Sequence, residues 1–174
     1  EVVRYQTAGD DQSKIADEIR EAWKEADLIL TTGGVSVGDK DLVPDVIESL
    51  NGRVLFHGIR VKPGMPTMLS VVKGTPVLSL SGNPFAVEAL FEVLAGGYLT
   101  DMEASRYLQK NQMKVLKQTF VKTGKMKRIV KGRCDESGVY LPQIQKNGQL
   151  KNGIGSNCLV IFPEGERTYA EGEG

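Results

Sequence analysis

The sequence predicts an α/β fold followed by a small all-β domain, and three patterns support this. Up to residue 103, segments with helical spacing of apolar residues alternate with short apolar runs typical of strands buried on both faces. Glycine and proline loops separate these segments. After Asp101 the helical spacing disappears and short strand-like runs follow. We therefore expect a three-layer, mostly parallel sheet over residues 1–103 and a small β-barrel or sandwich over residues 104–174.

Helical and strand segments can be assigned in order along the first domain. Ile15, Ile19 and Trp23 recur at four-residue spacing, so one side of that segment packs inward as a helix. A later helix carries Pro44 in its first turn, where a missing amide hydrogen has no intrahelical partner. The expected helices cover residues 13–25, 42–50 and 84–99, and the expected strands cover residues 26–30, 54–56, 59–61, 67–72 and 76–80.

Charge and hydropathy exclude several classes of function. The chain has 174 residues, with 22 Lys plus Arg and 22 Asp plus Glu. Its formal net charge is therefore zero, and it does not favour a polyanionic partner. Its apolar runs are too short to span a bilayer. We therefore expect no nucleic-acid partner, no membrane partner and a cytoplasmic location. Cys134 and Cys158 lack a CxxC spacing, so two buried, reduced thiols are expected rather than a zinc site.

Three loops at expected strand ends carry the candidate binding residues. In a parallel α/β layer, ligands bind beyond the carboxyl ends of the strands, where such loops cluster. The loops read TTGGVSVGDKD over residues 31–41, KPGMP over residues 62–66 and SGNP over residues 81–84. His57, the sole histidine, is expected to be structural or on the surface, so a Ser-His-Asp triad is not available. Positioning and charge stabilisation, with a metal, would have to carry any chemistry.

The first loop predicts an anion site. Glycine has no Cβ and reaches positive φ, so the backbone around Gly33, Gly34 and Gly38 can approach an oxyanion closely. The spacing matches neither the dinucleotide fingerprint nor the P-loop, which disfavours both of those sites. Asp39 and Asp41 close the loop and suggest Mg²⁺ held by few protein ligands and by phosphate oxygens. The alternative for either carboxylate is a plain helix cap.

The other two loops add a cation and a second candidate anion site. Lys62 stands in a segment stiffened by Pro63 and Pro66, which favours a functional lysine over a solvent-facing one. The third loop offers a hydroxyl, a permissive glycine, an amide and the start of a helix, and together these groups can bind an anion. The alternative is that all three loops are only tight connections, which would require three coincidences.

At these residues the chain resembles the molybdopterin molybdenumtransferase family, known as MoeA in bacteria, with gephyrin as an animal relative. Residues 33–41 resemble its GGVSxGxxD signature, residues 62–66 its KPGKP loop and residues 81–84 its PGNP loop, in the same order and spacing. The MogA and MoaB proteins tend to carry a GGTG form of the first loop instead. Residues 154–172 resemble the family's C-terminal β-domain. The resemblance implies a MogA-like first domain and a C-terminal fragment of a longer protein.

This resemblance implies a transferase of molybdenum cofactor biosynthesis that inserts molybdate into adenylylated molybdopterin and releases AMP, with Mg²⁺. Asp41 and Lys62 would be catalytic, and Asp39 and Asp41 would be metal-binding. The molybdopterin-binding residues would be Thr32, Gly33, Gly34, Ser36, Val37, Gly38, Pro63, Gly64, Pro66, Ser81, Gly82, Asn83 and Pro84. A homodimer is implied for the full-length protein, and the fragment alone is expected to be inactive.

Two substitutions depart from the family pattern. Met65 replaces the second lysine of KPGKP, which removes a cation that could hold molybdate. Ser81 replaces the first proline of PGNP and adds a hydroxyl donor. Two alternatives to the enzyme also stay open, a module that binds molybdopterin without turnover and a scaffold of the kind that the gephyrin relation allows. The scaffold ranks third because the sequence has no clear partner-binding stripe.

Overall fold

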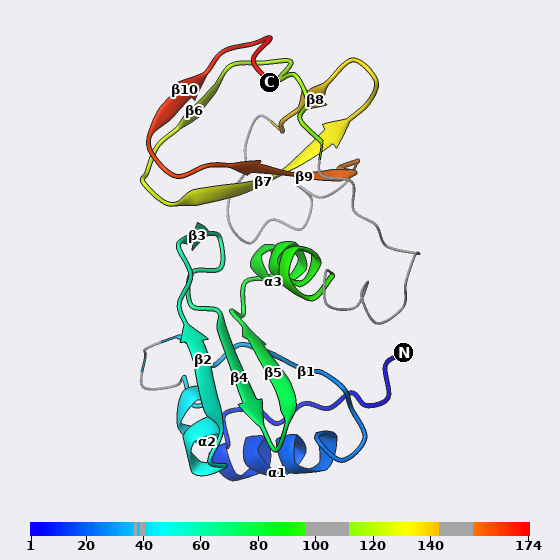
Figure 1. Cartoon of the computed structure of the whole chain (residues 1–174), viewed down its shortest axis with the longest axis vertical. Helices are drawn as coiled ribbons and strands as arrows, with labels where there is room; N and C mark the ends of the chain where they lie inside the picture. The colour runs from blue at the N-terminus through cyan, green and yellow to red at the C-terminus, as the bar shows by residue number, and fades with distance from the viewer. Residues whose placement is uncertain (37, 39–40, 97–111, 143–154) are drawn as a thin grey trace. The chain divides into compact units, whose positions relative to one another are not determined.

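The computed structural model describes residues 1–36, 38, 41–96, 112–142 and 155–174. The chain divides into two compact units, both visible in Figure 1. The first comprises Glu1–Ile59 and Gly64–Asn83, and the second comprises Arg60–Pro63 and Pro84–Gly174. The expected domain boundary after residue 103 lies outside the described residues.

A mixed four-stranded sheet forms the first unit. Its strands, in the spatial order β1-β5-β4-β2 (Figure 1), are β1 (Ile29–Thr32), β5 (Thr75–Leu80), β4 (Met68–Val72) and β2 (Arg53–His57). Strands β1 and β5 run parallel, whereas β5 with β4 and β4 with β2 are antiparallel pairs. The chain is an α/β protein, as the sequence predicted. The expectation of a mostly parallel sheet is wrong for the described strands.

The turn between β4 and β5 explains the antiparallel pairing. Lys73 and Gly74 both have positive φ, of 52° and 91°. A two-residue turn with this conformation has the twist of a tight hairpin, so it returns the chain along the strand that it has just left. The sequence indicated a turn here, but a Lys-Gly pair lacks the Asn-Gly signature of such hairpins. The hairpin geometry was therefore missed.

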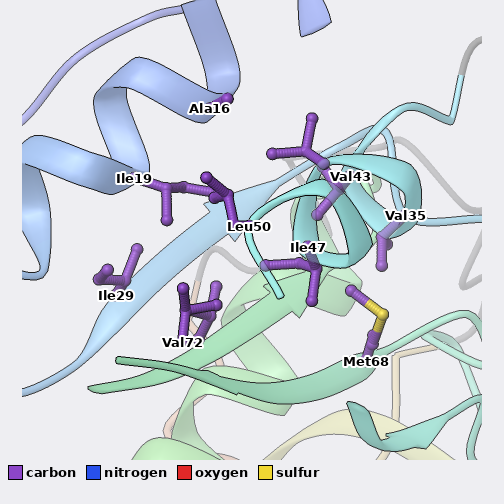
Figure 2. Packing of buried hydrophobic residues seen from close by; sticks show 11 residues of the cluster. Ala16, Ile19, Ile29, Val35, Val43, Ile47, Leu50, Met68 and Val72 are labelled. Carbon is purple, nitrogen blue, oxygen red and sulfur yellow. The ribbon is translucent and has the colours of Figure 1, made fainter. Parts of the chain in front are cut away.

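Two helices cover one face of this sheet. Helix α1 (Gln12–Ala22) begins after Asp11, whose carboxylate accepts hydrogen bonds from the amides of Ser13 and Lys14 at 3.0 and 3.2 Å. Helix α2 (Val43–Ser49) follows the first loop, with a proline in its first turn. The apolar sides of both helices and of the sheet form one core (Figure 2), which contains Ala16, Ile19, Ile29, Val35, Val43, Val46, Ile47, Leu50, Met68, Val72 and Val77.

The opposite face of β1 is more open than the sequence predicted. Ile29 lies in the core, whereas Leu30, the next residue, is 42% exposed, so β1 is not buried on both faces in this structure. The expected three-layer fold has helices on both faces of the sheet. In the described part of the first unit, the helices α1 and α2 form one layer only. No helix in the described ranges is long and apolar enough to cross a membrane.

The second unit is built around β7. Its elements are β3 (Val61–Lys62), α3 (Pro84–Leu90), the π-helical turn η1 (Phe91–Ala95), β6 (Phe120–Lys122), β7 (Lys127–Cys134), β8 (Val139–Tyr140), β9 (Cys158–Phe162) and β10 (Arg167–Tyr169). Strands β8 and β9 pair with β7 in antiparallel fashion, and β3 pairs with it in parallel. Strand β10 pairs with β6, and Phe120 stacks on Phe162 with ring centroids 4.5 Å apart.

Strands are present where the all-β region was expected, but a separate all-β domain is not shown. The compact unit that holds β6 to β10 also includes α3 and β3, because β3 extends the sheet of β7. Its core is formed by Leu116, Val130, Val139, Leu141, Phe162 and Tyr169. The two cysteines pack against this core as free thiols and are half-buried rather than fully buried.

Candidate functional site

The first glycine loop begins where β1 and β5 end side by side. Thr32, the last residue of β1, is in parallel register with Leu80, the last residue of β5. The amide of Gly33 then donates to the carbonyl oxygen of Leu80 at 2.9 Å. Gly33 and Gly34 have φ of 84° and 62°, a conformation that residues with a Cβ rarely adopt. Glycine at both positions therefore permits the turn itself.

The third loop contacts the first. A Cβ built on Gly82 would lie 3.6 Å from the Cα of Gly33, which is an ordinary van der Waals distance. This proximity follows from the parallel pairing of β1 and β5, because both chains leave the sheet at the same edge. The structure thus brings the first and third loops together within one unit.

Three contacts fix the first loop to its surroundings. Val35 is 1% exposed and anchors the loop in the core. Its carbonyl oxygen lies 2.7 Å from Nε2 of His57, and because a carbonyl only accepts, Nε2 must carry the hydrogen. The amide of Val43, at the start of α2, donates to the carbonyl oxygen of Gly34 at 2.9 Å. His57 is thus structural, as expected. Sequence reasoning missed Val35, although an apolar residue inside a glycine loop was a usable signal.

Asp41 closes the far end of this loop. Its Oδ2 accepts from the amide of Gly38 at 2.9 Å, and its own amide donates to the carbonyl oxygen of Gly38 at 2.8 Å. Helix α2 starts after Leu42 and receives no side-chain cap from that residue. The described hydrogen bond of Asp41 therefore lies within the loop and does not cap the helix. The Gly38 amide bonds one of the two carboxylate oxygens of Asp41, Oδ2.

Two buried hydroxyls lie beneath the first and third loops. Thr31 of β1 and Ser79 of β5 are partners in the parallel register. Their hydroxyl oxygens are buried, and neither has a hydrogen-bond partner among the described residues. A buried hydroxyl without a partner costs about 1 to 3 kcal/mol, so this edge of the sheet favours an additional polar group. Sequence reasoning missed this pair, because facing positions on two strands are known only once their register is known.

The second loop does not fall within one unit. Lys62 ends β3 in the second unit, where it is exposed and in register with Arg128 of β7. Gly64, with φ of 101°, and Met65, which is 50% exposed, belong to the first unit. The structure therefore does not relate Lys62 to the Gly33 and Gly82 loops, although the sequence analysis grouped all three.

The remaining site candidates divide by their surroundings. Val37 and Asp39 lie outside the described residues, so the contact and the metal ligand expected there stay predictions. The exposed candidates are Thr32, Gly82 and Pro84, the half-buried ones are Ser36, Pro66, Ser81 and Asn83, and Pro63 is buried. Within the described ranges, no group of three His, Cys, Asp or Glu side chains could hold a metal ion. A metal site here would depend on few protein ligands.

Comparison with known proteins defines the class to which this sheet and its glycine loops belong. Residues 1–101 match the family model described as a probable molybdopterin binding domain. The chain belongs to this molybdopterin-binding family, which confirms the family resemblance seen in the sequence.

Curated relatives of the chain carry a more specific name. The molybdopterin molybdenumtransferase of Staphylococcus aureus (strain COL) is 29% identical over 177 residues, which cover 99% of this chain and 42% of that protein. The enzyme of the same name from Staphylococcus epidermidis (strain RP62A) is 27% identical with the same coverage. This chain thus spans less than half the length of the curated relatives that it matches.

Solved structures agree with this fold. The molybdopterin biosynthesis MoeA protein of Pyrococcus horikoshii is 26% identical, with a TM-score of 0.76 over 94% of this chain and 40% of that one. A molybdenum cofactor biosynthesis protein of Pyrococcus furiosus, 22% identical with a TM-score of 0.70 over 94% of this chain and 53% of that one, shares the fold. The likeness extends past the matched family domain, because 94% coverage includes strands of the second unit.

Proposed function

We propose that this chain carries the molybdopterin site of an enzyme that inserts molybdate into adenylylated molybdopterin and releases AMP. The observation that carries the proposal is the contact between the Gly33 and Gly82 loops at the ends of the parallel strands β1 and β5. Glycine at both positions lets an anion approach the backbone of the two loops with little steric hindrance from side chains. The amides of Gly33 and Gly38 are already bonded to Leu80 and Asp41, so they would shape the loop rather than donate to the anion. The names of the Staphylococcus relatives support the choice of substrate.

The loops would divide the ligand between them. The backbone of Gly33, Gly34 and Gly38, with the hydroxyl of Ser36, would cradle the pterin phosphate. The opposite wall would be formed by Ser81, Gly82, Asn83 and Pro84, with Thr32, Val37, Pro63, Gly64 and Pro66 as further contacts. Support for this arrangement comes from the positive φ angles of Gly33 and Gly34, because these angles turn the backbone at the strand ends.

Asp41 fits one ligand position of a Mg²⁺ ion. One of its carboxylate oxygens is held by the amide of Gly38, which fixes the direction of the other. Mg²⁺ is commonly bound by one or two carboxylates together with waters and substrate phosphates, so a site with Asp41 and Asp39 as its protein ligands is chemically sufficient. When bound, the ion would neutralise phosphate charge during release of AMP. Asp41 itself would orient the phosphate that is linked to the metal.

Lys62 completes the proposed catalytic pair. Its ammonium would stabilise negative charge as AMP leaves. Its position at the end of β3, exposed to solvent, leaves the ammonium accessible. Met65 carries no charge, so in this proposal molybdate is not held by a second lysine of the loop. A cytoplasmic location and a homodimeric assembly belong to the same proposal.

A second candidate function is a module that binds molybdopterin without turnover. The observation that favours it is coverage, because this chain spans 42% of the Staphylococcus aureus enzyme. The 174-residue chain alone would then bind the pterin and remain inactive. A scaffold in which a dimerising surface carries the function ranks behind both candidates.

The two candidates are separated by one assay. The 174-residue chain is mixed with adenylylated molybdopterin, molybdate and Mg²⁺, and both pterin binding and AMP release are followed. The Staphylococcus aureus molybdopterin molybdenumtransferase serves as the positive control. Binding with AMP release supports the enzyme, and binding without release supports the non-catalytic module. A folded chain that does not bind the pterin overturns both.

A further inference from the structure

Lys131 lies on the face of β7 that is turned away from the core of the second unit. Val130, the preceding residue, is part of that core, and successive residues of a strand point to opposite faces. Helix α3 lies on the Lys131 face of the strand (Figure 1). The side chain of Lys131 is only 14% exposed there, so its ammonium is largely removed from water. A charge in such a place needs partners within the protein.

Two residues of α3 are these partners. Nζ of Lys131 forms an ion pair with Oε2 of Glu88 at 2.5 Å and lies 5.5 Å from the centroid of the Phe85 ring. The second distance is within the range of a cation–π interaction. Phe85 and Glu88 are three residues apart, so they are neighbours on one side of the helix. A single side chain of β7 therefore contacts the first and the second turn of α3.

Helix α3 depends on contacts outside itself to keep its position. It has seven residues, and helices of this length are marginal on their own in water. Its buried residues are Ala86, Ala89 and Leu90. Burial of such apolar surface stabilises the helix but is non-directional. The contacts with Lys131 are directional, so they favour one orientation of the helix.

The third loop ends on this helix without a spacer. Pro84 is the last residue of the loop and the first residue of α3, and Phe85 follows it directly. The proline ring fixes the φ angle of Pro84, so a shift of α3 is transmitted to the end of the loop. The orientation of α3 therefore affects a loop that the proposed function places at the molybdopterin.

We propose that Lys131 is a positioning residue for the molybdopterin site, because it holds Phe85 and Glu88 and thereby fixes the Pro84 end of the third loop. This inference rests on the proposed function, and in this role Lys131 does not touch the ligand. Glu88 is 57% exposed, so the ion pair adds little to the stability of the fold. Its loss changes the fraction of molecules with a binding-competent loop more than it changes folding.

The test is a double-mutant cycle on the affinity of the 174-residue chain for adenylylated molybdopterin. Lys131→Met should weaken binding by about fivefold and Glu88→Gln by about threefold, sizes that follow from a partly exposed ion pair. The double variant should bind no more weakly than Lys131→Met alone, because both changes remove one interaction. Lys131→Arg keeps the charge and should bind almost as well as the original chain. The midpoint of thermal unfolding should shift by less than about 4 °C in each variant.

The matched control is Lys127→Met, at an exposed lysine on the same face of β7, and it should bind normally. If Lys131→Met weakens binding and Glu88→Gln does not, Lys131 acts on the ligand directly and the positioning role is wrong. Additive losses in the double variant, or unchanged binding in Lys131→Met, would also overturn it.

Hydrogen exchange in the ligand-free chain separates this inference from the proposed function. The amides of α3 should exchange severalfold faster in Lys131→Met than in Lys127→Met, because the helix is held less firmly. An original chain that does not bind the pterin overturns the proposed function, whatever the exchange rates are. An original chain that binds, with equal α3 exchange in the two lysine variants, overturns the role of Lys131 alone.

Discussion

At the residue scale, Gly38 and Asp41 hold each other in position. The amide of Gly38 donates to the carboxylate of Asp41, and a Cβ on Gly38 would lie only 3.0 Å from the same oxygen. A side chain at residue 38 would thus crowd the Asp41 carboxylate, whereas at Gly33 and Gly34 glycine is favoured by the backbone conformation. The glycine signature of the first loop combines two separate physical requirements.

The charge of Asp41 can be tested without disturbing the loop. Asp41→Asn keeps an oxygen that can accept from Gly38, but it removes the negative charge. We expect AMP release to fall by about 100-fold or more, because electrostatic groups at reaction centres have effects of this size. Pterin binding should fall much less. The assay uses whichever form of the protein, this chain or a longer one, releases AMP.

The matched control for Asp41 is Asp45→Asn, an exposed carboxylate in the first turn of α2. It should leave both pterin binding and AMP release unchanged. The Mg²⁺ dependence of pterin binding gives a readout that does not rely on turnover, and it should weaken only in Asp41→Asn. If binding, turnover and thermal stability decline together in Asp41→Asn, the residue has a structural role in the loop and the catalytic assignment is wrong.

The buried hydroxyl of Thr31 gives a second test at this scale. Thr31→Val removes an unpartnered hydroxyl but keeps the shape of the side chain, so the free energy of unfolding should change by less than about 0.5 kcal/mol or increase. Thr67→Val is the control, because the Thr67 hydroxyl is buried and donates to the carbonyl oxygen of Gly64 at 2.7 Å. That variant should lose about 1 kcal/mol in urea unfolding. A comparable loss in Thr31→Val would mean that its hydroxyl has a partner.

At the scale of elements, the start of α1 depends on Asp11. Its pKa is lowered first by the Ser13 hydroxyl and next by the Lys14 amide. Asp11→Ala should therefore lower the midpoint of thermal unfolding at neutral pH. A carboxyl whose pKa is lower in the folded than in the unfolded protein stabilises the fold at every pH above its unfolded pKa. This stabilisation is lost as the pH falls through the folded pKa. The difference in midpoint should be constant above about pH 5 and shrink below about pH 4.

Asp10→Ala provides the control for the cap, since Asp10 is the exposed carboxylate next to Asp11 and lies outside the helix. Its midpoint should follow that of the original chain at every pH. An Asp11→Ala difference that persists unchanged at pH 2 to 3 would show that the stabilisation does not come from the ionised cap.

The junction between α2 and β2 depends on Gly52. A Cβ at this position would lie 2.7 Å from Cγ2 of Ile47 and 2.9 Å from Cγ2 of Val72, both in the core. Gly52→Ala should therefore destabilise the protein by about 1 to 3 kcal/mol, because overpacked cores respond with strain of this size. Urea unfolding measures the change. Asn51→Gly, at an exposed residue with φ of 54°, should be nearly neutral, and equal losses in both variants would contradict the steric explanation.

At the scale of the whole molecule, local patterns predicted more than pairings did. Ile19 marked the inward side of α1 by helical spacing alone, and it is buried. Strand direction was not readable in this way, since Lys73 and Gly74 set the antiparallel pairing through backbone angles that a Lys-Gly pair does not signal. The spacing of apolar residues indicates which side of a helix or strand is buried. The direction in which two strands pair depends on the backbone geometry of the turn between them.

The candidate site shows the same division. The Gly33 and Gly82 loops could be grouped from the sequence, because each was expected to follow a strand of one sheet, and the structure brings them into contact. Thr31 and Ser79 could not be found, because their relation depends on the register of β1 and β5. Lys62 was grouped with these loops by motif, and it belongs to the other compact unit. A motif gives the residue type but not its neighbours.

The most direct test of the central claim is the affinity of this chain for adenylylated molybdopterin before and after Gly82→Val. Gly82 has no positive φ, so valine does not strain the backbone, but its branched side chain would project against Gly33. We expect the original chain to bind and Gly82→Val to lose about tenfold or more in affinity while it stays folded. Val121→Ala, at an exposed side chain of β6, should bind normally. Undiminished binding by folded Gly82→Val would contradict a molybdopterin site between these loops.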